Sequence, residues 1–452
     1  MPSFGWLEFI VLMQTVMPAL VFIPGLQSYR IVTRMAAYGL PLMAWIWAIL
    51  TSSRIAGGRK YPVATCMAVV AGWLVVSLAH PNCNTFNSAL CAVGLTIGVF
   101  CPVFWAPAAV KDSRQLQRVI VVLFLCNAAS AVIGLGQVYR PNTFMPSKVA
   151  IFEANRDVEN SYTVEAANGL KFVRPPGLTD NPGGAAVGGA TSCLIGLAFA
   201  VSPIAWWKRA GSLLLALIGL TIIFYSQVRS LLITLILGIG IWTVLLILRR
   251  EVKKLAILAT CVGILVLCAT GWILRSGGTV IFDRFLALFE DKATTVYYNN
   301  RGFFIENAIM YEIPTYPLGA GPGRIGMASA YFGNLLTPPD RIPLYAETQI
   351  EFWILDGGLP VFLLYPLALI LAFYSAWKIA LRSPNPSLAY WGGVVAVYGV
   401  FIAISCFGGV PFMTPTGVQF WVVFGALYGA QECSRVEMAK GGGREGFEAF
   451  GT

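Results

Sequence analysis

The sequence is poor in charge and in histidine, and each shortage excludes a class of protein. Charged residues make up 12% of the 452 residues, against roughly 25% in an ordinary soluble domain. A chain of this length with so few charges cannot cover a water-facing surface. His80 is the only histidine, and no Cys/His cluster has the spacing of a metal site. Because the chain also lacks a Walker A loop and a dinucleotide fingerprint, we do not expect an ATP-driven pump.

Hydrophobic residues make up 57% of the chain, and they lie in continuous runs. A membrane helix needs about 20 mostly apolar residues, whereas the strands of a membrane barrel alternate in character. The sequence therefore predicts an all-α, polytopic membrane helix bundle with about twelve transmembrane helices. The predicted blocks are Phe4–Ile23, Met35–Leu50, Pro62–Ala79, Ser88–Ala109, Val119–Val138, Gly183–Ala205, Ser212–Tyr225, Ser230–Leu248, Leu255–Leu274, Ile350–Trp377, Leu388–Phe407 and Gly417–Ala430.

The net charge of +10 is read as a topology signal. Lys and Arg collect in alternate short loops, near residues 54–60, 111–118, 208–209, 249–254 and 378–382. The positive-inside rule assigns these loops and both termini to the cytoplasm. We therefore expect a multi-pass protein of the bacterial inner membrane, and the basic surplus requires no nucleic-acid partner.

Residues 1–434 are predicted to form a single transmembrane domain with two long loops on the outer side, about 140–182 and 275–349. The second loop separates the ninth and tenth predicted helices, and its segment 281–292 has the pattern of an interfacial helix. Residues 435–452 are predicted to be a disordered cytoplasmic tail. Long loops in a compact domain are usually functional, so the site is expected on the outer side.

Four arginines on the outer side are candidate anion ligands. Arg174 precedes two prolines, and Arg229 lies in a tight turn where it opposes the topology bias. Arg301 is predicted to open a helix that runs through Ile313, and Arg324 follows a glycine-rich turn containing Gly319 and Gly321. Taken singly, each arginine could be an ordinary solvated or snorkelling residue, and glycines could simply reverse the chain.

The segment AETQIEFWILDGGLP supplies the acidic candidates. Glu347 comes just before an apolar run, and Asp356 and Gly358 interrupt that run. A broken helix at membrane depth is tolerated only where protein or a cavity surrounds it. Arginine forks suit phosphate oxygens. Four arginines and a carboxylate on one face therefore predict a site that binds an anion, such as a lipid diphosphate, beside a base.

These residues resemble the O-antigen ligase and O-antigen polymerase superfamily of bacterial envelope glycosyltransferases. The turn SQVRS, with Arg229, is similar to the family's Ser-Arg turn, and Arg301 followed by Pro317, Gly319 and Gly321 resembles its arginine helix and glycine turn. Asp356 and Gly358 stand where the family has Glu and Gly. Glu347 stands where its ligases have a catalytic His, a departure that favours the polymerases over the ligases.

The resemblance implies a transfer that needs no metal ion or cofactor and inverts the anomeric centre. The donor would be a glycan on undecaprenyl diphosphate, bound by Arg229 and Arg301 with help from Arg174 and Arg324. Glu347 would orient or deprotonate the hydroxyl of a glycan or lipid-linked acceptor. Membrane lipids, a flippase and a chain-length regulator are the expected partners.

Two alternatives stay open at this point. A ligase would transfer the same glycan to lipid A core or to a protein. A transporter or flippase of a lipid-linked sugar or small anion belongs to a different class, and would be expected to show repeated halves and charged residues within the bundle.

Overall fold

The computed structural model describes residues 5–23, 25–51, 61–112, 114–145, 162–165, 171–179, 181–277, 293–334 and 338–448. The fold is all-α, as predicted. Within these residues, nine helices are long and apolar enough to cross a membrane. They cover Pro62–Ala79, Phe86–Ala109, Arg114–Tyr139, Gly184–Val201, Trp206–Tyr225, Arg229–Leu248, Val252–Arg275, Gln349–Arg382 and Pro386–Ser405. The chain is therefore a multi-pass membrane protein.

Every one of the twelve predicted blocks overlaps a helix. In the first half of the chain these are α1 (Trp6–Ala19), α2 (Arg30–Thr51), α3 (Pro62–Val76), α4 (Phe86–Phe100), α5 (Pro102–Ala109), α6 (Arg114–Tyr139) and α10 (Gly184–Val201). The others are α11 (Trp206–Tyr225), α12 (Arg229–Leu248), α13 (Val252–Gly277), α19 (Gln349–Arg382), α20 (Pro386–Ser405) and α21 (Pro415–Glu448). Three blocks, on α1, α2 and α21, are not among the nine, so for them a membrane crossing stays a prediction.

Shorter elements connect the long helices. These are η1 (Leu20–Phe22), η2 (Gln27–Tyr29), η3 (Ser77–Ala79), α7 (Pro141–Phe144), α15 (Ala293–Tyr297), η4 (Tyr298–Gly302), α16 (Phe303–Asn307), η5 (Ala308–Glu312), α17 (Ile313–Thr315), α18 (Gly326–Phe332), η6 (Pro339–Arg341) and η7 (Pro411–Met413). The strands β1 (Thr163–Glu165) and β2 (Lys171–Val173) form an antiparallel ribbon that the sequence did not predict, with Val164 opposite Phe172.

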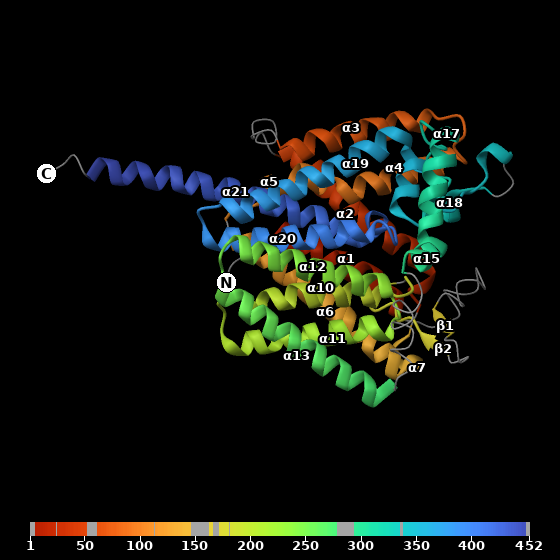
Figure 1. Ribbon diagram of the computed structural model, residues 1–452. Helices are drawn as coiled ribbons and strands as arrows, with labels where there is room; N and C mark the ends of the chain where they lie inside the picture. Colours follow the sequence, from red (N-terminus) through yellow and green to blue (C-terminus); the bar gives the residue numbers. More distant parts are fainter. Residues whose placement is uncertain are drawn as a thin grey trace.

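The two ends of the bundle differ. Both chain termini lie at one end, whereas α7, β1, β2, α15, α17 and α18 gather at the other, which we call the loop end (Figure 1). The stretch from α15 to α17 runs across the bundle helices there, so the two long predicted loops meet at one end. The predicted interfacial helix at 281–292 lies outside the described residues.

The centre of the bundle is formed by α10, which is buried along almost its whole length. Its small residues allow α11 to approach closely. A Cβ added to Gly189 would lie 2.6 Å from the Gly219 carbonyl oxygen, and one added to Gly219 would lie 2.4 Å from that of Gly189. Small residues are the usual means of close helix contact in membranes, where apolar side chains gain little from leaving lipid.

One predicted boundary is wrong. The helix that carries Arg301 does not begin at that residue, because it starts at Ala293 and continues through Thr315. At the end of the chain, α21 continues past its apolar block to Glu448 within the described residues, and the disorder of the tail 435–452 stays a prediction.

Candidate functional site

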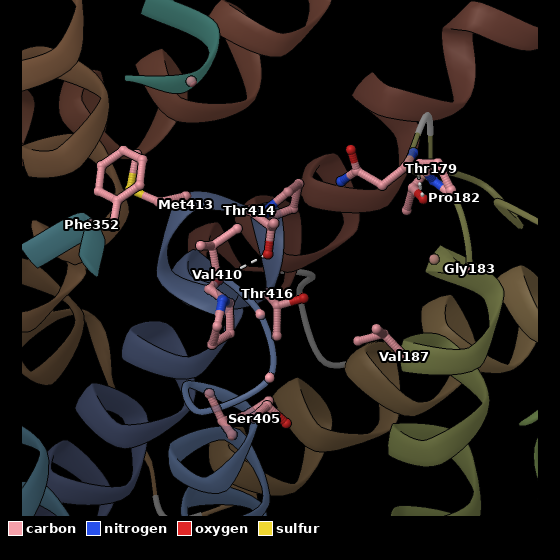
Figure 2. A pocket seen from close by; sticks show the side chains of 18 of the residues that line it. Thr179, Pro182, Gly183, Val187, Phe352, Ser405, Val410, Met413, Thr414 and Thr416 are labelled. Atoms are coloured by element: carbon pink, nitrogen blue, oxygen red, sulfur yellow. Dashed lines mark hydrogen bonds between the residues drawn. The ribbon is translucent and has the colours of Figure 1, made fainter. Parts of the chain in front are cut away.

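A cavity of about 690 Å³ lies at the loop end and extends between the helices. Figure 2 shows Thr179, Pro182, Gly183 and Val187 on one side of it, and Val410, Thr414 and Thr416 from the chain after α20 on the other. Its deeper wall is mostly apolar, with Leu95, Val99, Val187, Leu231, Ile233 and Ile402. Ile233 on α12 is also 47% exposed on the surface of the bundle. The apolar wall therefore reaches the surface that faces lipid.

Three arginines line this cavity: Arg34, Arg174 and Arg301. They come from α2, from the segment after β2 and from η4, so the fold collects them from distant parts of the chain. Burial, and then the charge of Arg301, lower the pKa of Arg174. Among the described residues, no acceptor forms a hydrogen bond with the buried Nε of Arg174. Two mutually repelling guanidinium groups in one cavity are the arrangement that an anion stabilises.

Arg34 was not predicted as a site residue. Its guanidinium donates to Asn181 Oδ1 at 3.2 Å and to Met327 Sδ at 3.6 Å, which ties α2 to the start of α10 and to α18. The signal that could have found it is the one used for Arg229, because both arginines lie on the side of the chain that otherwise lacks basic loops.

Arg301 and Glu347 form an ion pair, which joins the two predicted catalytic residues. The Tyr345 hydroxyl donates to the other carboxylate oxygen of Glu347. Both members of the ion pair are partly exposed, at 35% and 21% of the side chain. Burial is the main cause that lowers the pKa of Arg301, and the charges of Glu351 and Tyr297 oppose that shift.

Glu347 is held in place by the first turn of α19. Thr348 is the N-cap of that helix, and Glu351 completes a capping box. One oxygen of Glu351 accepts from the Glu347 amide at 2.9 Å and from the Thr348 amide at 2.8 Å. Neither Thr348 nor Glu351 was predicted as a site residue. The structure shows that they position the backbone of Glu347 beside Arg301.

The helical stretch that carries Arg301 contains two π-helical turns, η4 and η5. Each π turn adds a residue to the helix, and such turns are frequent at functional sites. Arg301 lies within the first of them. Glu312 ends the second, and burial followed by the charge of Glu351 raises its pKa to about 7. One of its oxygens is buried without a hydrogen-bond partner in the described structure.

The glycine-rich turn is not among the described residues that line the cavity, so donor binding by Gly319 and Gly321 stays a prediction. Gly319 and Gly321 have φ values of +99° and +97°, which only glycine adopts without strain. The turn packs against α19 where that helix breaks. The Ala320 amide donates to the Leu355 carbonyl at 2.7 Å, and the Leu359 amide donates to the Pro317 carbonyl at 2.9 Å. The turn therefore satisfies the backbone groups that the break leaves open.

Arg324, Asp356 and Gly358 belong to the same framework. Arg324 is 1% exposed, and its guanidinium donates to the carbonyls of Ile342 and Ala320, both at 2.9 Å. Its guanidinium thus stabilises the fold through these two backbone carbonyls, and Arg324 is not one of the residues that line the cavity. Gly358, at φ +65°, forms the predicted break in α19. Asp356 is buried beside that break, and its supporting role in the site stays a prediction.

Arg229 is the remaining predicted ligand. It begins α12, and its neighbours Val228 and Ser230 line the cavity, but Arg229 itself does not. Gln227, just before it, has a φ of +56°. This strained turn sets the direction in which α12 starts, and with it the direction of Arg229.

Within the described residues, no group of three or more His, Cys, Asp or Glu side chains could hold a metal ion. No model of a known protein family matches the chain, and no curated protein matches it.

Proposed function

We propose that the chain is a membrane glycosyltransferase that uses a glycan on undecaprenyl diphosphate as donor and joins repeat units at the loop end, as a polysaccharide or O-antigen polymerase does. The observation that carries this proposal is the cavity: Arg174 and Arg301 line it, Arg301 pairs with the acid Glu347, and much of the rest of its lining is apolar. A ligand with a charged diphosphate and a long apolar tail is complementary to both parts.

In this proposal the arginines bind the diphosphate and stabilise its charge as it leaves. An acceptor hydroxyl attacks the anomeric carbon, the bond from that carbon to the diphosphate oxygen breaks, and the lipid diphosphate departs with the electron pair. Glu347 accepts the proton of the hydroxyl. Arg34, which also lines the cavity, adds a cation to the ligands expected from sequence.

The Arg301–Glu347 ion pair bears on the order of these steps. An anion that binds Arg301 competes with Glu347, and once Arg301 turns to the diphosphate, the carboxylate is no longer neutralised by it. The base would therefore become effective when the donor is bound, which limits transfer to the occupied site.

A ligase would use the same donor site, so it remains the first alternative within the proposal. Transport is a second candidate, because the cavity is also lined by polar side chains from helices of the bundle, namely Gln14, Asn127 and Gln419. They offer a polar path that a solute could follow between the helices.

The test is a reconstitution of the purified chain with a lipid-diphosphate glycan and separate acceptors. Longer lipid-linked glycan supports a polymerase, and transfer to lipid A core or protein supports a ligase. Flux of a labelled solute across proteoliposomes without any new glycosidic bond would overturn the transferase and favour the transporter.

A further inference from the structure

A second pocket lies at the other end of the bundle, where α19 ends, α20 begins and α21 passes. Its volume is about 110 Å³. The share of liquid volume per water molecule is roughly 30 Å³, so the pocket has room for one small polar group. It is lined by Lys378, Arg382, Ser383, Pro384, Leu388, Gln431, Ser434, Arg435 and Met438.

Positive charge dominates this pocket. Lys378, Arg382 and Arg435 contribute three cations, and of the described residues that line the pocket none is acidic. Lys378 and Arg382 are four positions apart on one helix, a spacing at which like charges repel. Glu432 pairs with Arg435, which leaves the repulsion between the two α19 residues uncompensated within the lining. An anion between them would remove it.

The pocket has polar and apolar parts. Ser434 on α21 is 4% exposed and supplies a hydroxyl in its wall. Met438, also in the lining, is 45% exposed, and Leu381, next to Arg382 in the chain, is 41% exposed. A free phosphate ion would leave these side chains uncovered, whereas acyl chains of a lipid would cover them.

We propose that this pocket binds the phosphate group of an anionic membrane lipid. The site lies at the end of the bundle that carries both termini and the basic loops (Figure 1), which the positive-inside rule assigns to the cytoplasmic leaflet. Anionic lipids are concentrated in that leaflet, and basic pockets between membrane helices bind their headgroups. The lipid would hold α21 against the turn between α19 and α20, far from the cavity.

The experiment compares two double variants of the full-length protein. Lys378→Gln with Arg382→Gln removes two cations of the pocket. Arg114→Gln with Lys253→Gln removes two exposed cations from the same end of the bundle, outside the pocket, and is the matched control. Each variant is reconstituted in phosphatidylcholine with and without phosphatidylglycerol. Retained lipid is counted by native mass spectrometry, and the thermal midpoint is measured.

We expect the pocket variant to bind phosphatidylglycerol at least about tenfold more weakly, and to lose the stabilisation that this lipid gives, while the control keeps both. Equal losses in both variants would show only a general charge effect and overturn the site. Stabilisation by inorganic phosphate alone, as large as that by lipid, would overturn the lipid as ligand. If the double variant does not fold, Lys378→Gln alone gives the same comparison against Lys253→Gln.

Discussion

Arg301 and Glu347, which are 46 positions apart in the chain, form an ion pair beside the cavity at the loop end. The pair joins a π-helical turn to the residue before α19. The guanidinium of Arg301, which would bind an anion, is thus neutralised by the carboxylate of Glu347, which would accept the proton of a hydroxyl. An anion that binds Arg301 therefore competes with Glu347 for its positive charge.

This competition gives the first prediction. Glu347→Gln should bind a lipid-diphosphate donor at least as tightly as the unchanged protein, because Arg301 is freed, while the transfer rate falls about a hundredfold or more through loss of the base. Donor binding and single-turnover rates measure the two effects separately. Asp340→Asn, an exposed acid in the same loop, is the control and should change neither. Weaker donor binding in Glu347→Gln would contradict the competition.

The second prediction concerns the arginines that line the cavity. Arg174→Gln should weaken donor binding about ten- to a hundredfold, since charge-assisted hydrogen bonds are the strong ones. Arg34→Gln should act in the same direction. Arg140→Gln, an exposed arginine at the loop end that does not line the cavity, is the matched control. Titration of each variant with a labelled donor gives the dissociation constants.

The same assay with Arg229→Gln tests whether Arg229 is a diphosphate ligand, as its motif predicts, although it does not line the cavity. If Arg229 were a diphosphate ligand, as its motif predicts, this substitution would weaken binding as much as Arg174→Gln does. The lining of the cavity leads us to expect a smaller effect.

The class of the fold could be predicted because membrane helices satisfy their own backbone groups and need only continuous apolar runs. The break in α19 at Gly358 was also predictable, because the sequence Asp356–Gly357–Gly358 with Pro360 just after it is typical of an interrupted helix. The pairing of Arg301 with Glu347 could not be predicted from the sequence. It depends on how a helix that crosses the bundle end packs on α19, and no local pattern encodes that approach.

The roles of the arginines were the least predictable part. Arg324 follows a glycine turn that suggests anion binding, but its guanidinium is buried on two backbone carbonyls. Arg34 carries no motif, and it lines the cavity. The difference arises from tertiary structure, because the neighbours of these two arginines in the sequence do not show what their guanidinium groups contact.

The third prediction tests the framework around the break in α19. A Cβ on Gly358 would lie 2.4 Å from the Leu318 carbonyl carbon, and its φ of +65° adds strain for any other residue. Gly358→Ala should therefore destabilise the fold by about 1–3 kcal/mol or more, through strain and steric overlap. Gly263→Ala on α13 is the control, because a Cβ there meets nothing within 4 Å. Thermal unfolding in detergent compares the two, and an equal midpoint would show that the break tolerates side chains.

The last prediction uses the acid that ends η5. Burial, and then the charge of Glu351, raise the pKa of Glu312 from its ordinary value of 4.5 to about 7. Between these two values the folded chain holds a proton that the unfolded chain has released. Linkage then requires that Glu312 makes the fold less stable as the pH rises from about 4.5 to about 7.

Glu312→Gln removes this titration and keeps the shape of the side chain. Between these pH values, the thermal midpoint of the variant should fall less than that of the unchanged protein, because the contribution of Glu312 is gone. At neutral pH the variant should be at least as stable as the unchanged protein. Glu306→Gln on the same helical stretch is the control, since Glu306 is exposed. Thermal midpoints measured at several pH values in one buffer series show whether Glu312 carries this titration. An undiminished decline in Glu312→Gln would mean that another group carries the proton.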